Sequence, residues 1–181
     1  MRGEQIVLKR DCEAVQIPSG DPVYLYEGAE VTITQSLGDS FTVLTENGYM
    51  VRIAGKDADA LGKEVHRAHA PDAAPLSGEE LDQAAWDAMR TCYDPEIPVN
   101  IVELGLVYSC KIKELESGGH RIDAVITLTA PGCGMGPVLQ NDVRTKLLEL
   151  PGVEEVWVDV TFEPQWDQSM MSEAARLQLG M

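Results

Sequence analysis

The sequence predicts an α+β protein built from two domains, and three patterns support this prediction. Short runs of β-forming residues separated by turn residues fill positions 1–67, which is typical of a small antiparallel barrel or sandwich. Helical and strand periodicities then alternate over 77–162 in the order α-β-β-α-β. Between these regions, positions 68–76 are rich in alanine and proline and lack apolar periodicity, which is typical of a linker.

The first domain is predicted from the spacing of its strands and turns. The expected strands are 5–9, 13–17, 23–25, 30–35, 41–45 and 49–53. Proline, glycine and aspartate lie between them, and Asn47-Gly48 is a dipeptide typical of a tight hairpin. The sequence shows no catalytic combination of side chains in this domain.

The second domain is expected to begin with a helix over 78–93. Ser77 and Glu80 form a capping-box pattern, and apolar residues follow at helical spacing. The next stretch contains Pro95 and Pro98 and cannot continue the helix, because each proline disfavours the helical conformation in the residue before it.

Two strands, a helix and a third strand follow. Alternation over 105–114 and 121–129, interrupted by a glycine turn, predicts an antiparallel hairpin. Helically spaced apolar residues then extend to Leu150, and valines at alternate positions, ending at Phe162, predict the third strand. A right-handed crossover through the helix would make the second and third strands parallel, which gives a three-stranded mixed sheet.

Residues 163–181 are expected to form a tail with a short helix. Ser169 would cap this helix, with Met170, Ala174 and Leu177 on one side. Trp166 and the neighbouring methionines leave two interpretations open: a strip that binds a partner, and a tail docked on its own domain.

The loop after the second strand of this domain carries the main candidate site. Glycines can adopt positive φ and let backbone N–H groups converge, and Pro137 suits the first turn of a helix. A thiol beside a helix N-terminus favours the thiolate, which is the form that attacks electrophiles and binds metals. We therefore expect a functional thiol and metal ligand at Cys133, framed by Gly132, Gly134, Met135 and Gly136. The alternative is a cysteine packed in the core.

Other chemistries fit this loop less well. Its glycines do not have the spacing of a phosphate-binding loop, so no nucleotide is expected. A cysteine-dependent enzyme would need a base, and His66, His69 and His120 lie at the linker and at a hairpin tip. A cysteine-dependent enzyme thus remains the weakest alternative, and the protein is not expected to be an enzyme.

Asp94 and Glu96 are the remaining polar candidates. In one interpretation Asp94 serves the local turn and Glu96 is solvated. In the other, both carboxylates face the Cys133 loop and supply acceptors or a hard metal ligand. The sequence leaves both interpretations open.

Composition limits the partners and the compartment. The net charge is −16, which disfavours binding to nucleic acids and anionic membranes. No stretch resembles a signal peptide, and no apolar run reaches the roughly 20 residues of a membrane span, so a cytoplasmic protein is expected. A disulfide framework is not expected either, and Cys92 and Cys110 have the spacing of core residues.

Two motifs resemble one known family. DPEIPVNIVELGLVY at 94–108 and TLTAPGCGMG at 127–136 resemble the SufT/PaaD-type family of iron–sulfur assembly proteins, also described as a metal-sulfur cluster biosynthesis domain. The resemblance covers 77–162, and the β-rich first half together with the ending at 162–166 resembles SufT-type members in particular. It implies that Cys133 is the functional residue and that Asp94 and Glu96 are its companion motif.

The resemblance implies a role in assembling iron–sulfur clusters or delivering them to client apoproteins. Stable clusters normally take four protein thiolates, so a single exposed thiol implies at most a transient cluster, shared between two chains of a homodimer or completed by outside thiols. The expected partners are the assembly machinery and client apoproteins. The alternative from another class is a pure protein adaptor that never holds metal.

Overall fold

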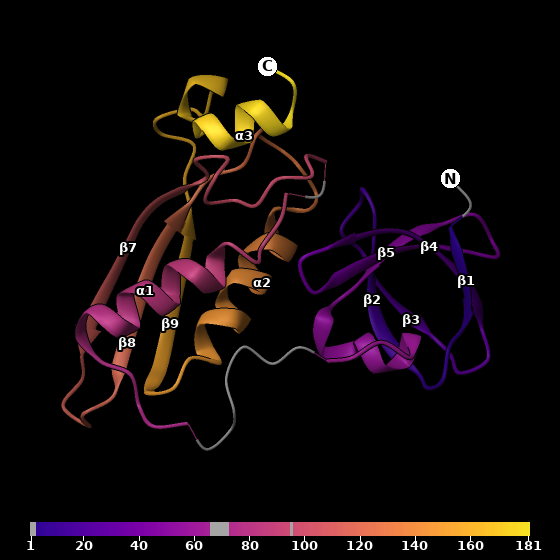
Figure 1. The fold of residues 1–181 in the computed structure, drawn as a ribbon, viewed down its shortest axis with the longest axis horizontal. Coiled ribbons are helices and arrows are strands. Elements are labelled where there is room, and N and C mark those ends of the chain that lie inside the picture. The colour runs from indigo at the N-terminus through magenta and orange to yellow at the C-terminus, as the bar shows by residue number, and fades with distance from the viewer. Residues whose placement is uncertain (1–2, 66–72, 95) are drawn as a thin grey trace. The chain divides into compact units, whose positions relative to one another are not determined.

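The computed structural model describes residues 3–65, 73–94 and 96–181. The chain separates into two compact units, Met1–Arg67 and Ala68–Met181. Figure 1 shows strands and a short 3-10 helix in the first unit, and both helices and strands in the second. His66, His69, Pro95 and positions 68–72 of the expected linker lie outside the described residues.

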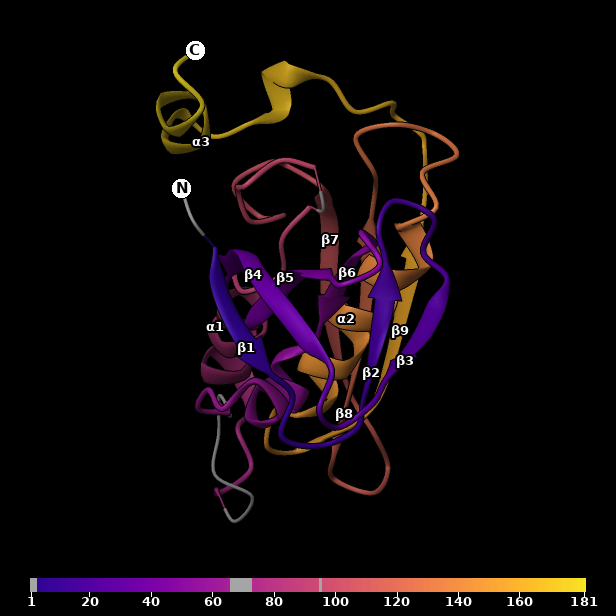
Figure 2. The ribbon, with the colours of Figure 1, turned by 90° about the vertical axis from the view of Figure 1, so that its right-hand side faces the viewer.

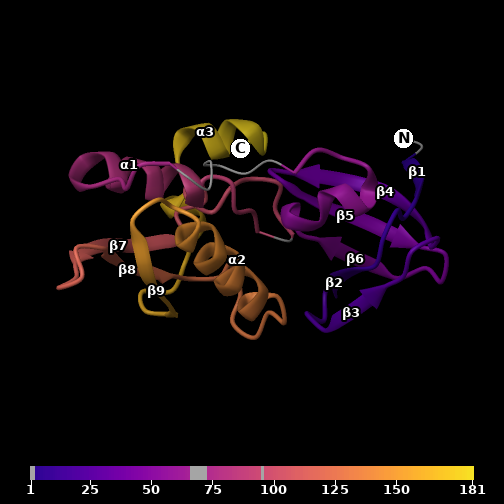
Figure 3. The same ribbon diagram turned by 90° about the horizontal axis from the view of Figure 1, so that it is seen from below.

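The first unit is built on a six-stranded antiparallel sheet (Figure 3). In this sheet the strands follow the order β1-β4-β5-β6-β2-β3, and a 3-10 helix, η1 (Gly55–Leu61), comes after β6. The strands are β1 (Glu4–Val7), β2 (Cys12–Gln16), β3 (Pro22–Leu25), β4 (Glu30–Leu37), β5 (Ser40–Thr45) and β6 (Met50–Ile53).

Alternation along these strands forms the core of the first unit. One face of the sheet carries the buried side chains of this core, among them Ala14, Val31, Val43 and Ile53. Leu61 from η1 packs into the same cluster. The sheet thus has one apolar side.

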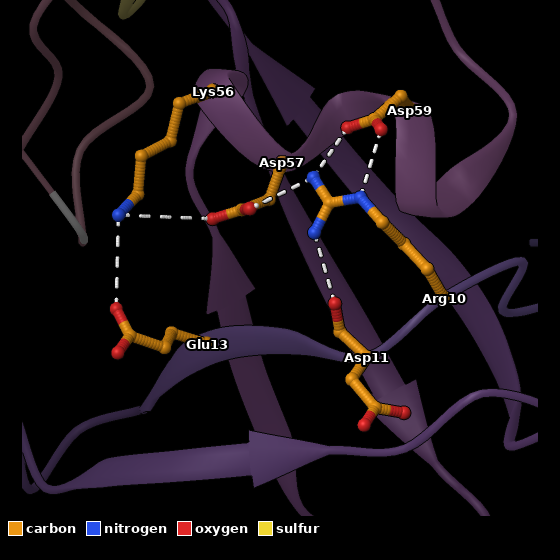
Figure 4. A network of polar contacts seen from close by, with 6 residues as sticks. All are labelled: Arg10, Asp11, Glu13, Lys56, Asp57 and Asp59. Carbon is orange, nitrogen blue, oxygen red and sulfur yellow. Dashed lines mark hydrogen bonds and ion pairs between the residues drawn. The ribbon is translucent and has the colours of Figure 1, made fainter.

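A network of charges joins η1 to the start of β2 (Figure 4). The Arg10 guanidinium lies 3.0 Å from an Asp57 oxygen and 2.6 Å from an Asp59 oxygen. Lys56 lies 3.6 Å from Glu13 on β2. Because most of these side chains are exposed, we assign the network a role in orienting η1 rather than a large share of the stability.

The second unit contains a three-stranded mixed sheet with the order β7-β8-β9. β7 and β8 are antiparallel, whereas β8 and β9 are parallel. The elements are α1 (Gly78–Met89), β7 (Val107–Glu114), β8 (His120–Ile126), α2 (Gly136–Leu148), β9 (Val153–Val160), the 3-10 helix η2 (Gln168–Met170) and α3 (Glu173–Gln178). This arrangement confirms the predicted α+β fold, including its mixed sheet.

Both long helices contribute to one core on one face of this sheet. Ile122 and Ala124 of β8 and Val156 of β9 belong to the same buried cluster as Leu81 of α1 and Leu139 of α2. The other face is more exposed, and the Arg121 guanidinium lies there 5.0 Å from the centre of the Trp157 ring. The helices therefore cover the face to which Ile122 and Ala124 point.

Two details of the helix ends differ from the sequence prediction. Ser77 is the N-cap of α1, but its side chain accepts no hydrogen bond, so the expected capping box is wrong. In addition, α1 ends at Met89 rather than at position 93. Cys92, although beyond the helix, is fully buried in the core, and this explains why it shared the helical spacing.

The C-terminal tail docks on its own unit, which resolves the two interpretations left open by the sequence. Figures 1 and 2 both place the tail at the end of the sheet where β9 stops. The Trp166 indole donates a hydrogen bond of 2.7 Å to the Leu104 carbonyl, and Met171 is buried in the core. Ser172 rather than Ser169 caps α3, and Leu177, expected on its packed side, is exposed.

None of the helices in the described residues combines the length and the hydropathy that a membrane span requires.

Candidate functional site

The candidate site is the loop that connects the end of β8 to the start of α2. The loop is fixed at its beginning by the Thr127 amide, which donates a hydrogen bond of 2.8 Å to the Leu106 carbonyl. Cys133 lies near its end, is partly exposed, and packs on one side against the core of the unit. The Cys133 side chain is therefore neither fully buried in the core nor fully exposed.

The reason for a glycine differs from one position of this loop to the next. Gly132 has a φ of +78°, a conformation that residues with a Cβ rarely adopt. Gly136 has an ordinary φ, but a Cβ there would lie 2.8 Å from Leu128 Cδ1. Gly134 is exposed and also lacks a positive φ, so the expectation that all three glycines use this freedom holds only at Gly132.

The backbone around Cys133 leads directly into the first turn of α2. The Cys133 carbonyl accepts a hydrogen bond of 3.1 Å from the Gly136 amide, and Met135 is the buried N-cap residue. Pro137 lies in the first turn, where a missing N–H costs no hydrogen bond. Pro131 and Gly132 form a turn that ends at Cys133. Within the described part of the chain, the amides of Gly134 and Met135 donate to no backbone carbonyl.

Asp94 forms a tight turn beside this loop. Its carboxylate accepts hydrogen bonds from the amides of Glu96 (2.9 Å) and Ile97 (3.1 Å). Burial raises the pKa of Asp94 above its ordinary value, and the two amides oppose that rise only in part. The Thr129 side chain also interacts with this carboxyl, so the turn and the β8–α2 loop meet at Asp94.

The structure separates the two carboxylates that the sequence groups together. Asp94 is 3% exposed and serves its local turn, while Thr129 brings the neighbouring loop to it. Glu96 is exposed, and its backbone amide rather than its carboxylate takes part in the turn. Asp94 therefore lies in its local turn with Thr129 beside it, whereas Glu96 lies exposed at that turn.

The grouping of metal-binding side chains bears on how Cys133 could hold iron. Among the residues that the structure describes, no three His, Cys, Asp or Glu side chains are grouped so that they could hold a metal ion. His120 lies at the start of β8, the end of that strand away from the loop.

Two threonines directly after β8 lie at the site but were not among the residues predicted from the sequence. Thr129 contacts Asp94, and Thr127 is fully buried with a side-chain hydroxyl that has no hydrogen-bond partner among the described residues. The available signal was a pair of polar residues directly after an apolar strand. Sequence spacing alone cannot show that Asp94, which comes 35 positions before Thr129, interacts with it.

The second unit is similar in sequence to known proteins. Residues 82–160 match the family described as iron-sulfur cluster assembly protein. A Fe-S protein maturation auxiliary factor of Porphyromonas gingivalis is 45% identical over 92 residues, which are 51% of this chain and 84% of that protein. The Fe-S protein maturation auxiliary factor SufT of Staphylococcus aureus is 40% identical over 88 residues, 49% of this chain and 96% of that protein. An iron-sulfur cluster carrier protein of Deinococcus radiodurans is 32% identical over 79 residues, 44% of this chain and 21% of that protein.

Proposed function

Because this chain belongs to the iron–sulfur cluster assembly protein family, as a SufT-type member, we propose that it is a maturation factor that passes iron–sulfur clusters to client apoproteins through Cys133. The observation that carries the proposal is the position of this thiol. It is partly exposed, while its loop is fixed to the core by Met135 and by the contact between Thr129 and Asp94.

The cluster is cargo in this proposal, and the ligand set supports that view. Iron–sulfur clusters held permanently normally have four protein thiolates. Cys133 supplies one, since Cys12 and Cys92 are buried, and burial raises the pKa of the Cys110 thiol to about 11. The other ligands must come from a second chain, from small thiols or from the client. Incomplete coordination by one chain favours transfer over storage.

The chemistry at Cys133 is ligand exchange at iron. The thiol loses its proton to solvent when the iron–sulfur bond forms, because the thiolate is the metal ligand. When a client thiolate replaces Cys133 at the iron, the Cys133 sulfur can take up a proton again, and no change in oxidation state is needed.

Asp94 acts as a positioning residue in this account. It holds the turn through two backbone amides and touches Thr129, four residues before Cys133. It therefore ties the first motif to the loop of the second without ligating the cluster itself. Glu96 lies exposed at the same turn and is open to contact with a partner.

Client activation tests the role of the thiol. The full-length protein, Cys133→Ser and the matched control Cys110→Ser are reconstituted anaerobically with iron and sulfide and mixed with apo-aconitase. We expect activation with the unchanged protein and with Cys110→Ser, and its loss with Cys133→Ser. Circular dichroism confirms that each variant is folded.

The alternative adaptor function predicts a different result. If Cys133→Ser activates the client as well as the unchanged protein does, the thiol has no role and the proposal fails. Capture of assembly partners that is unaffected by Cys133→Ser and lost on deletion of residues 1–67 would then support a pure adaptor.

A further inference from the structure

The first unit carries a concave site of about 370 Å³ that has no part in the chemistry at Cys133. Three tyrosines dominate its wall, and Tyr24, Tyr26 and Tyr49 are 56%, 65% and 56% exposed. Residues of β2 to β6, of the β3–β4 connection and of the β5–β6 turn complete it: Gln16, Val23, Leu25, Ala29, Glu30, Val31, Thr45, Glu46, Asn47 and Val51.

The tyrosine side chains are exposed to solvent rather than packed in the core. The centroids of Tyr24 and Tyr26 are 5.7 Å apart, with their planes inclined by 56°. They are two positions apart, so they project to the same side of the chain. Rings this exposed contribute little to the core, and a cluster of three beside a hollow is characteristic of a binding surface.

The charges of the site are negative. Glu30 and Glu46 line it, and the described lining residues include no lysine, arginine or histidine. Gln5 donates a hydrogen bond of 3.0 Å to Glu30, which orients this carboxylate without neutralising it. Tyrosine faces and carboxylates both attract a guanidinium group, the faces through their quadrupole and the carboxylates through charge and bidentate hydrogen bonds.

An unpaired strand edge borders the same hollow. β3 is last in the order of the sheet, so one of its two edges pairs with no other strand among the described residues. Three consecutive residues of β3, Val23, Tyr24 and Leu25, line the site. Since neighbouring side chains point to opposite faces, this pattern places the backbone edge itself at the wall. An extended peptide can hydrogen-bond to such an edge.

We propose that this site binds an extended, arginine-bearing segment of a partner polypeptide. The tyrosine faces and the two carboxylates hold the guanidinium groups, and the β3 edge aligns the backbone of the segment. Anionic partners such as nucleic acid are disfavoured by the same charges. The proposal does not use Cys133 and stands or falls separately from the proposed function.

A peptide titration tests this proposal. Full-length protein labelled with ¹⁵N is titrated in 0.1 M salt with a short capped peptide in which arginine alternates with alanine. The comparison peptide carries citrulline, a neutral isostere, in place of arginine. We expect amide shifts confined to the lining residues and an affinity about tenfold weaker for the citrulline peptide, because the cation contributes at several contacts.

Two variants separate this site from general attraction to an acidic protein. Tyr26→Leu keeps the charge and is expected to weaken binding about threefold, while the matched aromatic control Phe162→Leu has no effect. Equal affinity for both peptides, an equal effect of the two variants, or shifts spread over both units overturns the proposal. Concentration-dependent self-association through the same residues also overturns it, because a second copy would then be the occupant.

Discussion

At the scale of single residues, the four cysteines share one chemistry but lie in different environments. Cys12 and Cys92 are 2% and 0% exposed, so reagents cannot reach them in the folded protein. Burial and the nearby Asp82 raise the pKa of Cys110 to about 11, which keeps it protonated at neutral pH. Cys133 is partly exposed on the loop that begins α2. We therefore expect Cys133 to react with thiol reagents faster than the other three cysteines.

Alkylation measures that selectivity. With iodoacetamide at pH 8, we expect Cys133 to be modified at least about tenfold faster than Cys110, because the thiolate is the reactive form and Cys110 retains its proton. Peptide mass spectrometry against time gives each rate, and protein unfolded in urea shows all four reacting alike. A folded protein in which Cys110 reacts as fast as Cys133 would contradict the assigned environments.

Asp94 gives the stability of the protein a predictable pH dependence. Its pKa is raised in the folded state, so the folded state favours the protonated carboxyl. The contribution of Asp94 to the free energy of unfolding is thus greatest when Asp94 is protonated, and this contribution falls as the pH rises from the ordinary aspartate value of about 3.9 through the raised value. Asp94→Asn cannot ionise, and its amide oxygen can still accept the two turn hydrogen bonds.

Urea unfolding of both proteins between pH 3.5 and pH 7 isolates this effect. We expect the unchanged protein to lose stability relative to Asp94→Asn as the pH rises over that window. A difference between the two proteins that stays constant with pH, or that changes in the opposite direction, would show that burial does not disfavour the charged carboxylate.

Residue-level prediction succeeded where the signal is local. A cysteine framed by glycines and followed by a proline was sufficient to locate the loop before α2. The contact between Asp94 and Thr129 was not predictable, because it joins residues far apart in sequence. The Ser172 cap was missed for another reason: Ser169 and Ser172 are both reasonable caps, but the Ser169 amide donates to Asp167 in η2, and the Ser172 amide donates to the distant Glu103 carbonyl.

At the scale of elements, the β8–α2 connection depends on one backbone conformation. Gly132 has a φ of +78°, and a Cβ there would meet no atom within 4 Å. A substitution at this position therefore changes the backbone energy without causing a clash. The connection is a suitable place to measure how much the loop conformation contributes to stability.

Two substitutions at Gly132 measure this contribution. We expect Gly132→Ala to lower the free energy of unfolding by about 1–2 kcal/mol, because the left-handed region is unfavourable for residues with a Cβ. Gly132→Asn should cost less, since asparagine visits this region more readily. Urea midpoints give both values. Equal stability of the alanine variant and the unchanged protein would mean that the loop adopts another conformation in solution.

The order and type of the elements followed from periodicity, whereas their ends did not. The six short strands of the first unit and the α-β-β-α-β order of the second were predicted from apolar spacing and turn residues. The 3-10 helix η1 was missed, because its glycine, lysine and aspartate pattern resembles a loop and Leu61 is its only large buried side chain. The Arg10 network that holds it joins distant parts of the chain.

At the scale of the whole molecule, the second unit joins its two motifs and its tail into one structure. The tail packs on the segment that follows the Asp94 turn: Trp166 donates to the Leu104 carbonyl, and a Cβ on Gly105 would lie 2.2 Å from the Met170 carbonyl oxygen. This close approach explains the glycine there. The first motif thus supports the tail on one side and the Cys133 loop, through Asp94, on the other.

The most direct test of the account is whether a cluster is bound through Cys133. Full-length protein, Cys133→Ser and Cys110→Ser are reconstituted anaerobically with iron, sulfide and glutathione, and native mass spectrometry records the intact species. The account predicts a mass increase that corresponds to an iron–sulfur cluster, on one or two chains, for the unchanged protein and for Cys110→Ser, and none for Cys133→Ser. The same cluster mass at the same abundance in Cys133→Ser would contradict it.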